Sequence, residues 1–222
     1  MRYDLVIFDC DGVLVDTERL TVGVEARILS ELGWPHTAAE VVARFMGRSS
    51  EAQLSEVAAR LGPDAARRFD ELSTAEIHAA FERELAAVPG VVDVVDACHR
   101  RGARTCIASS GSHERMRRTL GLAGLWELFG ERIFSATEVV TGKPAPDLFL
   151  HAAATMGAKP SATAVIEDSV YGVAAAVAAG MTAYGFAGGL TPRESLAGAG
   201  AVVFHEMAEL VVMLDQSPRG PM

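Results

Sequence analysis

Positive charge is scarce in this sequence. Its 222 residues carry 29 acidic side chains against 20 lysines and arginines, and the formal net charge is −9. A protein that binds nucleic acid needs clustered cations to displace the counterions of the phosphates, so this balance argues against nucleic acid as a partner. A small anionic substrate in a locally positive pocket remains compatible with it.

Long apolar runs are absent as well. No stretch reaches the roughly 20 apolar residues that a helix needs to cross a bilayer. The N-terminal segment lacks the layout of a signal peptide, because Asp4 interrupts it before an apolar core forms. Half of the residues are hydrophobic, so the chain can bury a core, which excludes a disordered protein. We expect no membrane partner.

Cysteine is rare too. The spacing of Cys10, Cys98 and Cys106 matches neither a disulfide framework nor a metal-binding motif. An odd number of cysteines without an export signal indicates reduced thiols. We expect all three to be small packing residues in a cytoplasmic protein.

Short apolar segments rich in Val and Ile alternate with helical stretches along most of the chain. Their lengths, together with nearby Gly and Pro, favour buried strands. The expected strands are 4–9, 104–109, 132–136, 163–168, 182–186 and 201–204. Alternation of strands and helices predicts a Rossmann-like α/β fold, in which helices cover both faces of a parallel sheet.

Residues 17–88 interrupt this alternation. They show no strand signal and carry apolar residues at helical spacing. The segment from Thr37 to Glu40 matches a capping box, which marks the beginning of a helix. We therefore predict a helical domain over 17–88, inserted after the first strand of an α/β core domain that combines 1–16 with 89–222.

Acidic side chains follow the first expected strand. Asp9 and Asp11 form a DxDG motif with Gly12, which permits a tight turn. Alternation along a strand directs the two carboxylates to the same side. They stand at the carboxyl end of the strand, where open α/β sheets bind their ligands. Taken alone, the motif is also compatible with a polar loop that covers the edge of a sheet.

Two further segments bring groups that suit a phosphate. Ser109 and Ser110 follow the second expected strand and precede a helix, whose amides and dipole favour an anion. Lys143, one of only two lysines, follows the third strand and supplies a compact point charge where arginine would supply a planar fork. An ordinary N-cap at Ser112 and a solvated loop lysine are the alternatives.

Glu167 and Asp168 end the fourth expected strand. Bringing them together with Asp9 and Asp11 is unfavourable unless a cation offsets the repulsion. Oxygen ligands without clustered His or Cys point to a hard ion, Mg²⁺ first. The alternative for the acidic pair is a favourable interaction with the dipole of the helix that follows.

The order and spacing of these motifs resemble the haloacid dehalogenase (HAD) superfamily, in the subgroup with a helical cap between the first and second motifs. The first motif appears here as DCDGVLVDTE from residue 9 to residue 18. Ser109 matches the second motif, Lys143 in GKPAPD the third, and Glu167 and Asp168 in EDSVYG the fourth. Within the superfamily, the chain looks like the sugar-phosphate phosphatases and the β-phosphoglucomutases.

The resemblance implies a Mg²⁺-dependent phosphatase for a small phosphorylated metabolite, with a sugar phosphate as the expected substrate. Asp9 would be the nucleophile that forms an aspartyl phosphate, and Asp11 the general acid and base. Asp9, Asp11 and Asp168 would hold Mg²⁺, with Glu167 close by or linked through water.

The same resemblance gives roles to the polar residues around the phosphate. Ser109, Ser110 and Lys143 would neutralise charge on the transferring group. Arg48 lies in the cap region, where members of the superfamily often contact substrate.

Two alternatives to a phosphatase remain. A β-phosphoglucomutase uses the same aspartyl phosphate, but the mutases carry a histidine four residues beyond the threonine of the first motif. That position is Thr21 here, which favours hydrolysis over isomerisation. The third hypothesis, a binding protein with an inactive site, is disfavoured because the acids are intact at every motif.

Overall fold

The chain forms two compact units in the computed structural model, which describes residues 2–45 and 50–216. One unit combines residues 1–16 with residues 86–222, and the other comprises residues 17–85. Among the described residues, all named strands belong to the first unit, and the second unit is helical.

The first unit is built on a sheet of six strands in the order β3-β2-β1-β4-β5-β6. Every neighbouring pair is parallel; Val6 of β1, for example, pairs with Thr105 of β2 and with Ala164 of β4. The strands are β1 (Leu5–Phe8), β2 (Arg104–Ser109), β3 (Ile133–Ser135), β4 (Thr163–Glu167), β5 (Thr182–Phe186) and β6 (Val202–Phe204). Each expected strand segment contains one of them, and the predicted Rossmann-like α/β fold is confirmed.

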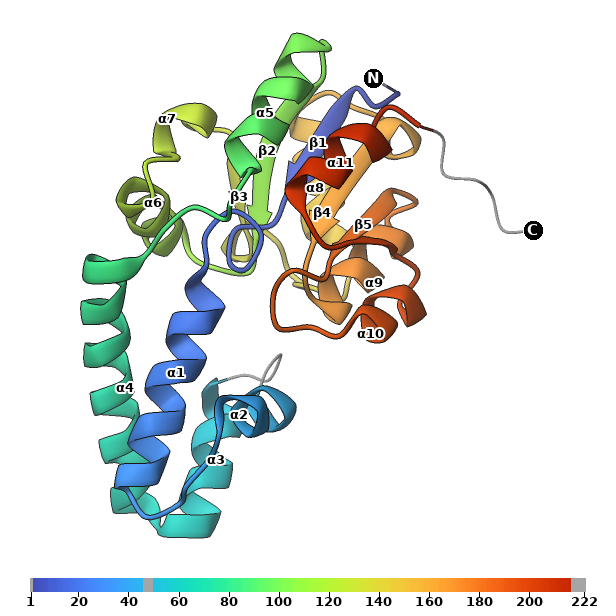
Figure 1. Ribbon diagram of the computed structural model, residues 1–222. Coiled ribbons are helices and arrows are strands. Elements are labelled where there is room, and N and C mark those ends of the chain that lie inside the picture. Colours follow the sequence, from blue (N-terminus) through green and yellow to red (C-terminus); the bar gives the residue numbers. More distant parts are fainter. Residues whose placement is uncertain (1, 46–49, 217–222) are drawn as a thin grey trace. The chain divides into compact units, whose positions relative to one another are not determined.

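Helices cover both faces of this sheet (Figure 1). In one layer, α8 packs on β1, β2 and β3 while α9 packs on β4 and β5; in the other, α5 packs on β2 and on α11. Right-handed crossovers explain the two layers. Connections that run along the sheet from β1 toward β3 place their helices on one face, and connections that run toward β6 place theirs on the opposite face. The helices are α5 (Val91–Arg100), α6 (His113–Leu122), α7 (Trp126–Phe129), α8 (Asp147–Thr155), α9 (Val170–Ala178), α10 (Arg193–Gly198) and α11 (Met207–Met213), with the 3₁₀ helices η1 (Ala136–Glu138) and η2 (Pro160–Ala162).

The central strands β1 and β4 are apolar except at the two ends of β4, Thr163 and Glu167. All four residues of β1 and all five of β4 are buried. Leu5 and Ile7 of β1 pack in one cluster with Val165 of β4 and Phe149 of α8. A parallel sheet that is covered on both faces requires such continuous apolar strands. Polar side chains that carry chemistry therefore collect where the strands end.

The second unit is formed by α1 (Thr17–Glu31), α2 (Ala38–Phe45), α3 (Ser50–Leu61) and α4 (Pro63–Glu84), and α4 packs against both α1 and α3. The predicted capping box begins α2. Thr37 N–H donates to Glu40 Oε2 at 2.8 Å, and Glu40 N–H donates to Thr37 Oγ1 at 3.3 Å. None of the described helices is long and apolar enough to span a membrane.

The chain rejoins the first unit at Ala86, before the boundary after residue 88 that the sequence predicted. Backbone hydrogen bonds explain the difference. Asp16 N–H donates to the carbonyl of Ala86 at 3.2 Å, and Val88 N–H donates to the carbonyl of Leu14 at 2.9 Å. The returning segment is thus bonded to the outgoing one and belongs with the sheet.

Candidate active site

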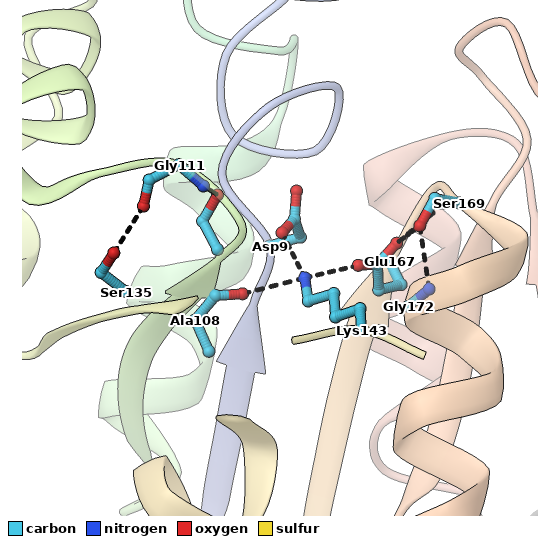
Figure 2. A network of polar contacts seen from close by, with 9 residues as sticks. Asp9, Ala108, Gly111, Ser135, Lys143, Glu167, Ser169 and Gly172 are labelled. Atoms are coloured by element: carbon cyan, nitrogen blue, oxygen red, sulfur yellow. Dashed lines mark hydrogen bonds and ion pairs between the residues drawn. The ribbon is translucent and has the colours of Figure 1, made fainter. Parts of the chain in front are cut away.

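Lys143 lies at the centre of a buried group of charges at the carboxyl end of the sheet (Figure 2). Its Nζ donates to Asp9 Oδ1 at 2.5 Å, to Glu167 Oε1 at 2.7 Å and to the carbonyl of Ala108 at 3.1 Å. The lysine side chain is 5% exposed, and its Nζ lies 4.8 Å from the centre of the Phe149 ring. Residues from four segments that are far apart in the sequence therefore meet here.

One ammonium thus stands between two carboxylates. Burial raises the pKa of Asp9 to about 8, Lys143 opposes this rise, and Glu167 adds to it. Burial alone would lower the pKa of Lys143, but the attraction of Asp9 and Glu167 outweighs it and holds this pKa above its usual value. Because Nζ lies 2.5 Å from Asp9 Oδ1, the geometry supports an ion pair. The raised pKa of Asp9 reflects how strongly burial opposes that pair.

Glu167 is held in turn by the first turn of α9. The N–H and the hydroxyl of Ser169 both donate to Glu167 Oε2 at 2.8 Å, and Ser169 Oγ accepts from Gly172 N–H at 3.0 Å as the N-cap. A Cβ at Gly172 would overlap the Glu167 carboxylate, so this position requires glycine. With Oε1 bonded to Lys143 and Oε2 to Ser169, Glu167 is better suited to orient the lysine than to bind a metal directly.

Asp11 lies beside the loop that follows β2. Its Oδ1 accepts from Arg115 Nη2 at 3.2 Å, and a Cβ at Gly111 would lie 3.7 Å from its Oδ2. Ser109 is buried at the end of β2, and its Oγ accepts from Gly111 N–H at 3.2 Å. Ser110, the next residue, is exposed. A Cβ at Gly111 would also lie 3.6 Å from Ser109 Oγ, so the structure brings Asp11 close to the serine of the second motif.

The loop after β2 is also bonded to the end of β3. Ser135 Oγ donates to the carbonyl of Gly111 at 2.8 Å (Figure 2) and accepts from Thr137 N–H at 3.2 Å. Glu138 Oε1 accepts from Ser135 N–H at 2.6 Å and lies 2.8 Å from His113 Nε2. His113 thus belongs to a structural network that supports the loop.

Asp168 lies against the turn that follows Asp11. It is buried, and a Cβ at Gly12 would overlap its Oδ2. Gly12 has a φ of 80°, in the left-handed region that favours glycine. Conformation and packing both require glycine here, and together they bring Asp168 close to the DxDG motif.

The side chains at this edge offer carboxylate oxygens, the type of ligand that a hard divalent cation prefers. Asp9, Asp11 and Asp168 offer oxygen ligands at the ends of β1 and β4, which are neighbours in the sheet. Among the residues that the structure describes, no three Asp, Glu, His or Cys side chains are arranged to hold a metal ion as they stand. Lys143 contacts Asp9 and Arg115 contacts Asp11, and these two cations offset part of the repulsion between the carboxylates.

The remaining predictions concern Ser112, the three cysteines and Arg48. Ser112 is the N-cap of α6 and accepts from Arg115 N–H at 3.2 Å. All three cysteines are buried and unbridged, as expected of packing residues. Arg48, predicted to contact substrate, lies outside the described residues.

The sequence did not reveal three contributors to this site, Arg115, Ser169 and Gly172. Arg115 belongs to a charged stretch of α6, and its spacing does not distinguish it from Arg117 or Arg118. The signal for Ser169 and Gly172 was present in EDSVYG, where a serine N-cap directly follows the acidic pair.

Comparison with known proteins assigns the chain to a family. The family model of haloacid dehalogenase-like hydrolases matches residues 3–180. The chain belongs to this family. The match confirms the resemblance that the four motifs predicted, and with it the prediction that this protein is a hydrolase.

Three similar proteins illustrate the relationship. The 6-phosphogluconate phosphatase of Escherichia coli strain K12 is 29% identical over 186 residues, which cover 83% of this chain and 83% of the relative. The fructose-1-phosphate phosphatase of the same strain is 32% identical over 186 residues, covering 82% of this chain and 95% of the relative. A HAD family hydrolase from Deinococcus radiodurans R1, solved with bound phosphate and sodium, has a TM-score of 0.82 at 33% identity and covers 94% of this chain and 93% of its own.

Proposed function

We propose that this HAD-like hydrolase is a Mg²⁺-dependent phosphatase, which hydrolyses sugar phosphates through an aspartyl phosphate on Asp9. The observation that carries the proposal is the buried contact of Lys143 with Asp9 and Glu167, with Asp11 and Asp168 at the same edge of the sheet. Two relatives are named for phosphorylated sugars, 6-phosphogluconate and fructose 1-phosphate, and a similar hydrolase binds phosphate. These names support a sugar phosphate as the substrate class.

In the first half of the reaction, Asp9 is the nucleophile. Lys143 holds Oδ1, so attack falls to Oδ2, which bonds to phosphorus while the bond from phosphorus to the ester oxygen breaks. Asp11 gives its proton to the leaving oxygen. Lys143, the Ser109 hydroxyl and the Ser110 amide stabilise the negative charge on the phosphoryl oxygens.

In the second half, Asp11 is ionised and takes a proton from a water molecule. The oxygen of this water attacks phosphorus, the bond from phosphorus to Asp9 breaks, and inorganic phosphate leaves. Both carboxyl groups then return to their starting states, so atoms and protons balance over the cycle.

Asp9, Asp11 and Asp168 would hold the metal, Asp11 through its backbone carbonyl. When bound, Mg²⁺ neutralises charge on the phosphoryl group and favours the ionised form of Asp9, whose pKa burial raises. Glu167 keeps its bonds to Lys143 and Ser169 and sets the position of the lysine.

Asp9→Asn tests the covalent mechanism. The amide keeps the size of the side chain and a hydrogen-bond acceptor for Lys143, but it cannot attack phosphorus. We expect acid quenching of a reaction with ³²P-labelled substrate to trap a phosphoprotein in the parent and none in the variant. Asp93→Asn, on the exposed side of α5, is the matched control and should behave as the parent. Hydrolysis by Asp9→Asn at near the parental rate would overturn the proposal.

A panel of sugar phosphates and nucleotides, assayed for inorganic phosphate, tests the substrate class. We expect hexose or pentose phosphates to be the best substrates. The same samples, supplied with β-glucose 1-phosphate and a bisphosphate primer, should form negligible glucose 6-phosphate. Efficient isomerisation with little free phosphate would instead identify a mutase.

A further inference from the structure

Arg115 contacts the general acid and base without belonging to any of the four motifs. Its Nη2 donates to Asp11 Oδ1 at 3.2 Å from the first turn of α6. The backbone of Arg115 is held on both sides: its N–H donates to Ser112 Oγ at 3.2 Å, and its carbonyl accepts from Thr119 Oγ1 at 3.1 Å. The arginine therefore projects from a well-fixed point of the helix.

The contact distinguishes the two oxygens of Asp11. Oδ1 is bonded to Arg115, whereas Oδ2 lies near the loop after β2, 3.7 Å from where a Cβ at Gly111 would stand. The same Cβ would lie 3.5 Å from Cδ of Arg115, so Gly111 leaves space in which the arginine stem and the carboxylate approach one another.

We propose that Arg115 is a positioning residue, which holds Oδ1 of Asp11 so that Oδ2 faces the leaving oxygen of the substrate and carries the transferred proton. The inference rests on the proposed function, in which Asp11 protonates that oxygen. Arg115 acts only through Asp11 and leaves the attack by Asp9 unchanged.

Stability does not explain this ion pair. The side chains of Arg115 and Asp11 are 47% and 23% exposed, and partly exposed ion pairs of this kind contribute little to folding. Displacing a catalytic group by about 1 Å can cost about 100-fold in rate. The contact therefore has much more effect on proton transfer than on the fold.

The test uses the dependence of the rate on the leaving group. A sugar alcohol leaves poorly and needs the proton from Asp11, whereas 2,4-dinitrophenolate leaves without it. For Arg115→Met we expect kcat/KM to fall about 10- to 100-fold on the best sugar phosphate, and less than about threefold on 2,4-dinitrophenyl phosphate. Arg115→Lys should recover most of the loss. Arg117→Met, on the same helix and over the Trp126 ring, is the matched control and should leave both rates unchanged.

A double-mutant cycle on phenyl phosphate, whose leaving group still needs the proton, separates positioning from other roles. In an Asp11→Asn background, Arg115→Met should cause no further loss, because the group it positions has gone. An additional loss as large as in the parent would overturn the inference.

The remaining outcomes also decide the matter. An equal loss of kcat/KM on the sugar phosphate and on the dinitrophenyl ester would indicate that Arg115 binds the phosphate. No loss on either substrate would indicate a surface ion pair without a role in the reaction. Each of these results overturns the positioning role of Arg115 while the phosphatase proposal stands. If the parent hydrolyses none of these esters, the proposed function fails and the inference fails with it. Urea unfolding of Arg115→Met, expected to have a midpoint close to that of the parent, shows that the variant is folded.

Discussion

Replacing Lys143 with Met removes the ammonium at the centre of the site and keeps an apolar stem of similar length. In the parent, this ammonium lies 2.5 Å from Asp9 and 2.7 Å from Glu167. Both acids are buried, 7% and 1% exposed, so the variant leaves two carboxylates close together without the cation between them. Removing one partner of a buried ion pair costs about 3–5 kcal/mol. We expect a loss of that size at pH 9, where Asp9 of the parent is ionised, a large share of the roughly 5–15 kcal/mol that stabilises a typical domain.

The size of this loss should depend on pH. Burial raises the pKa of Asp9 even in the presence of Lys143, and removing the lysine raises it further. The folded variant then holds a proton that the unfolded chain, with aspartate pKa values of about 4, has already released. A folded state that binds more protons loses stability as pH rises. Asp9 of the parent has a pKa of about 8 and binds the same proton below that pH, so the difference from the parent should grow as pH rises from 7 to 9 and should be smaller and constant below pH 7.

Urea unfolding followed by the fluorescence of Trp126 measures the effect on the unit that carries the site. The Trp34→Phe background is needed because Trp34 belongs to the other compact unit. Lys159→Met is the matched control, since Lys159 is the other lysine of the chain and is exposed. Equal stability of Lys143→Met and the parent at pH 9, or an equal loss at pH 6 and pH 9, would refute the electrostatic reasoning.

Three further results are expected. Gly172→Ala should lower kcat and destabilise the fold by about 1–3 kcal/mol, because its Cβ would overlap the Glu167 carboxylate, whereas Gly121→Ala on α6 meets no neighbour and should be neutral or stabilising in urea titrations. Chelation should abolish phosphate release, and Mg²⁺ but not the larger Ca²⁺ should restore it. Asp168→Asn should raise the Mg²⁺ concentration for half-maximal activity more than Glu167→Gln does. Activity that survives chelation would contradict the metal assignment. Burial raises the pKa of Cys106 to about 12, so a thiol reagent at pH 8 should modify this residue only after unfolding.

The sequence by itself determined the fold class and the place of the site. Continuous apolar segments such as Leu5–Phe8, separated by helices, are typical of parallel strands covered on both faces, and each became a strand. Parallel strands direct their carboxyl ends to one edge, so the polar residues that follow them were expected to meet. Asp9, Lys143 and Glu167 do lie together at this edge.

The domain boundary shows what local patterns leave open. The sequence placed the return to the core after residue 88, where the helical segment was expected to end. The bonds from Asp16 to Ala86 and from Val88 to Leu14 join segments that are far apart in the chain, and no periodicity reports them.

Only the tertiary structure decided which partner each acid has. Glu167 bonds to Lys143 and Ser169 in addition to lying beside the predicted metal ligands, and Asp11 bonds to Arg115 of a helix about 100 positions later in the sequence. Hydrogen bonds and ion pairs form only within about 3 Å, so a shift of a single ångström in how α6 packs on the sheet selects or loses a partner. Periodicity and motif spacing specify which edge a residue reaches, whereas the packing of helices against the sheet sets distances on that finer scale.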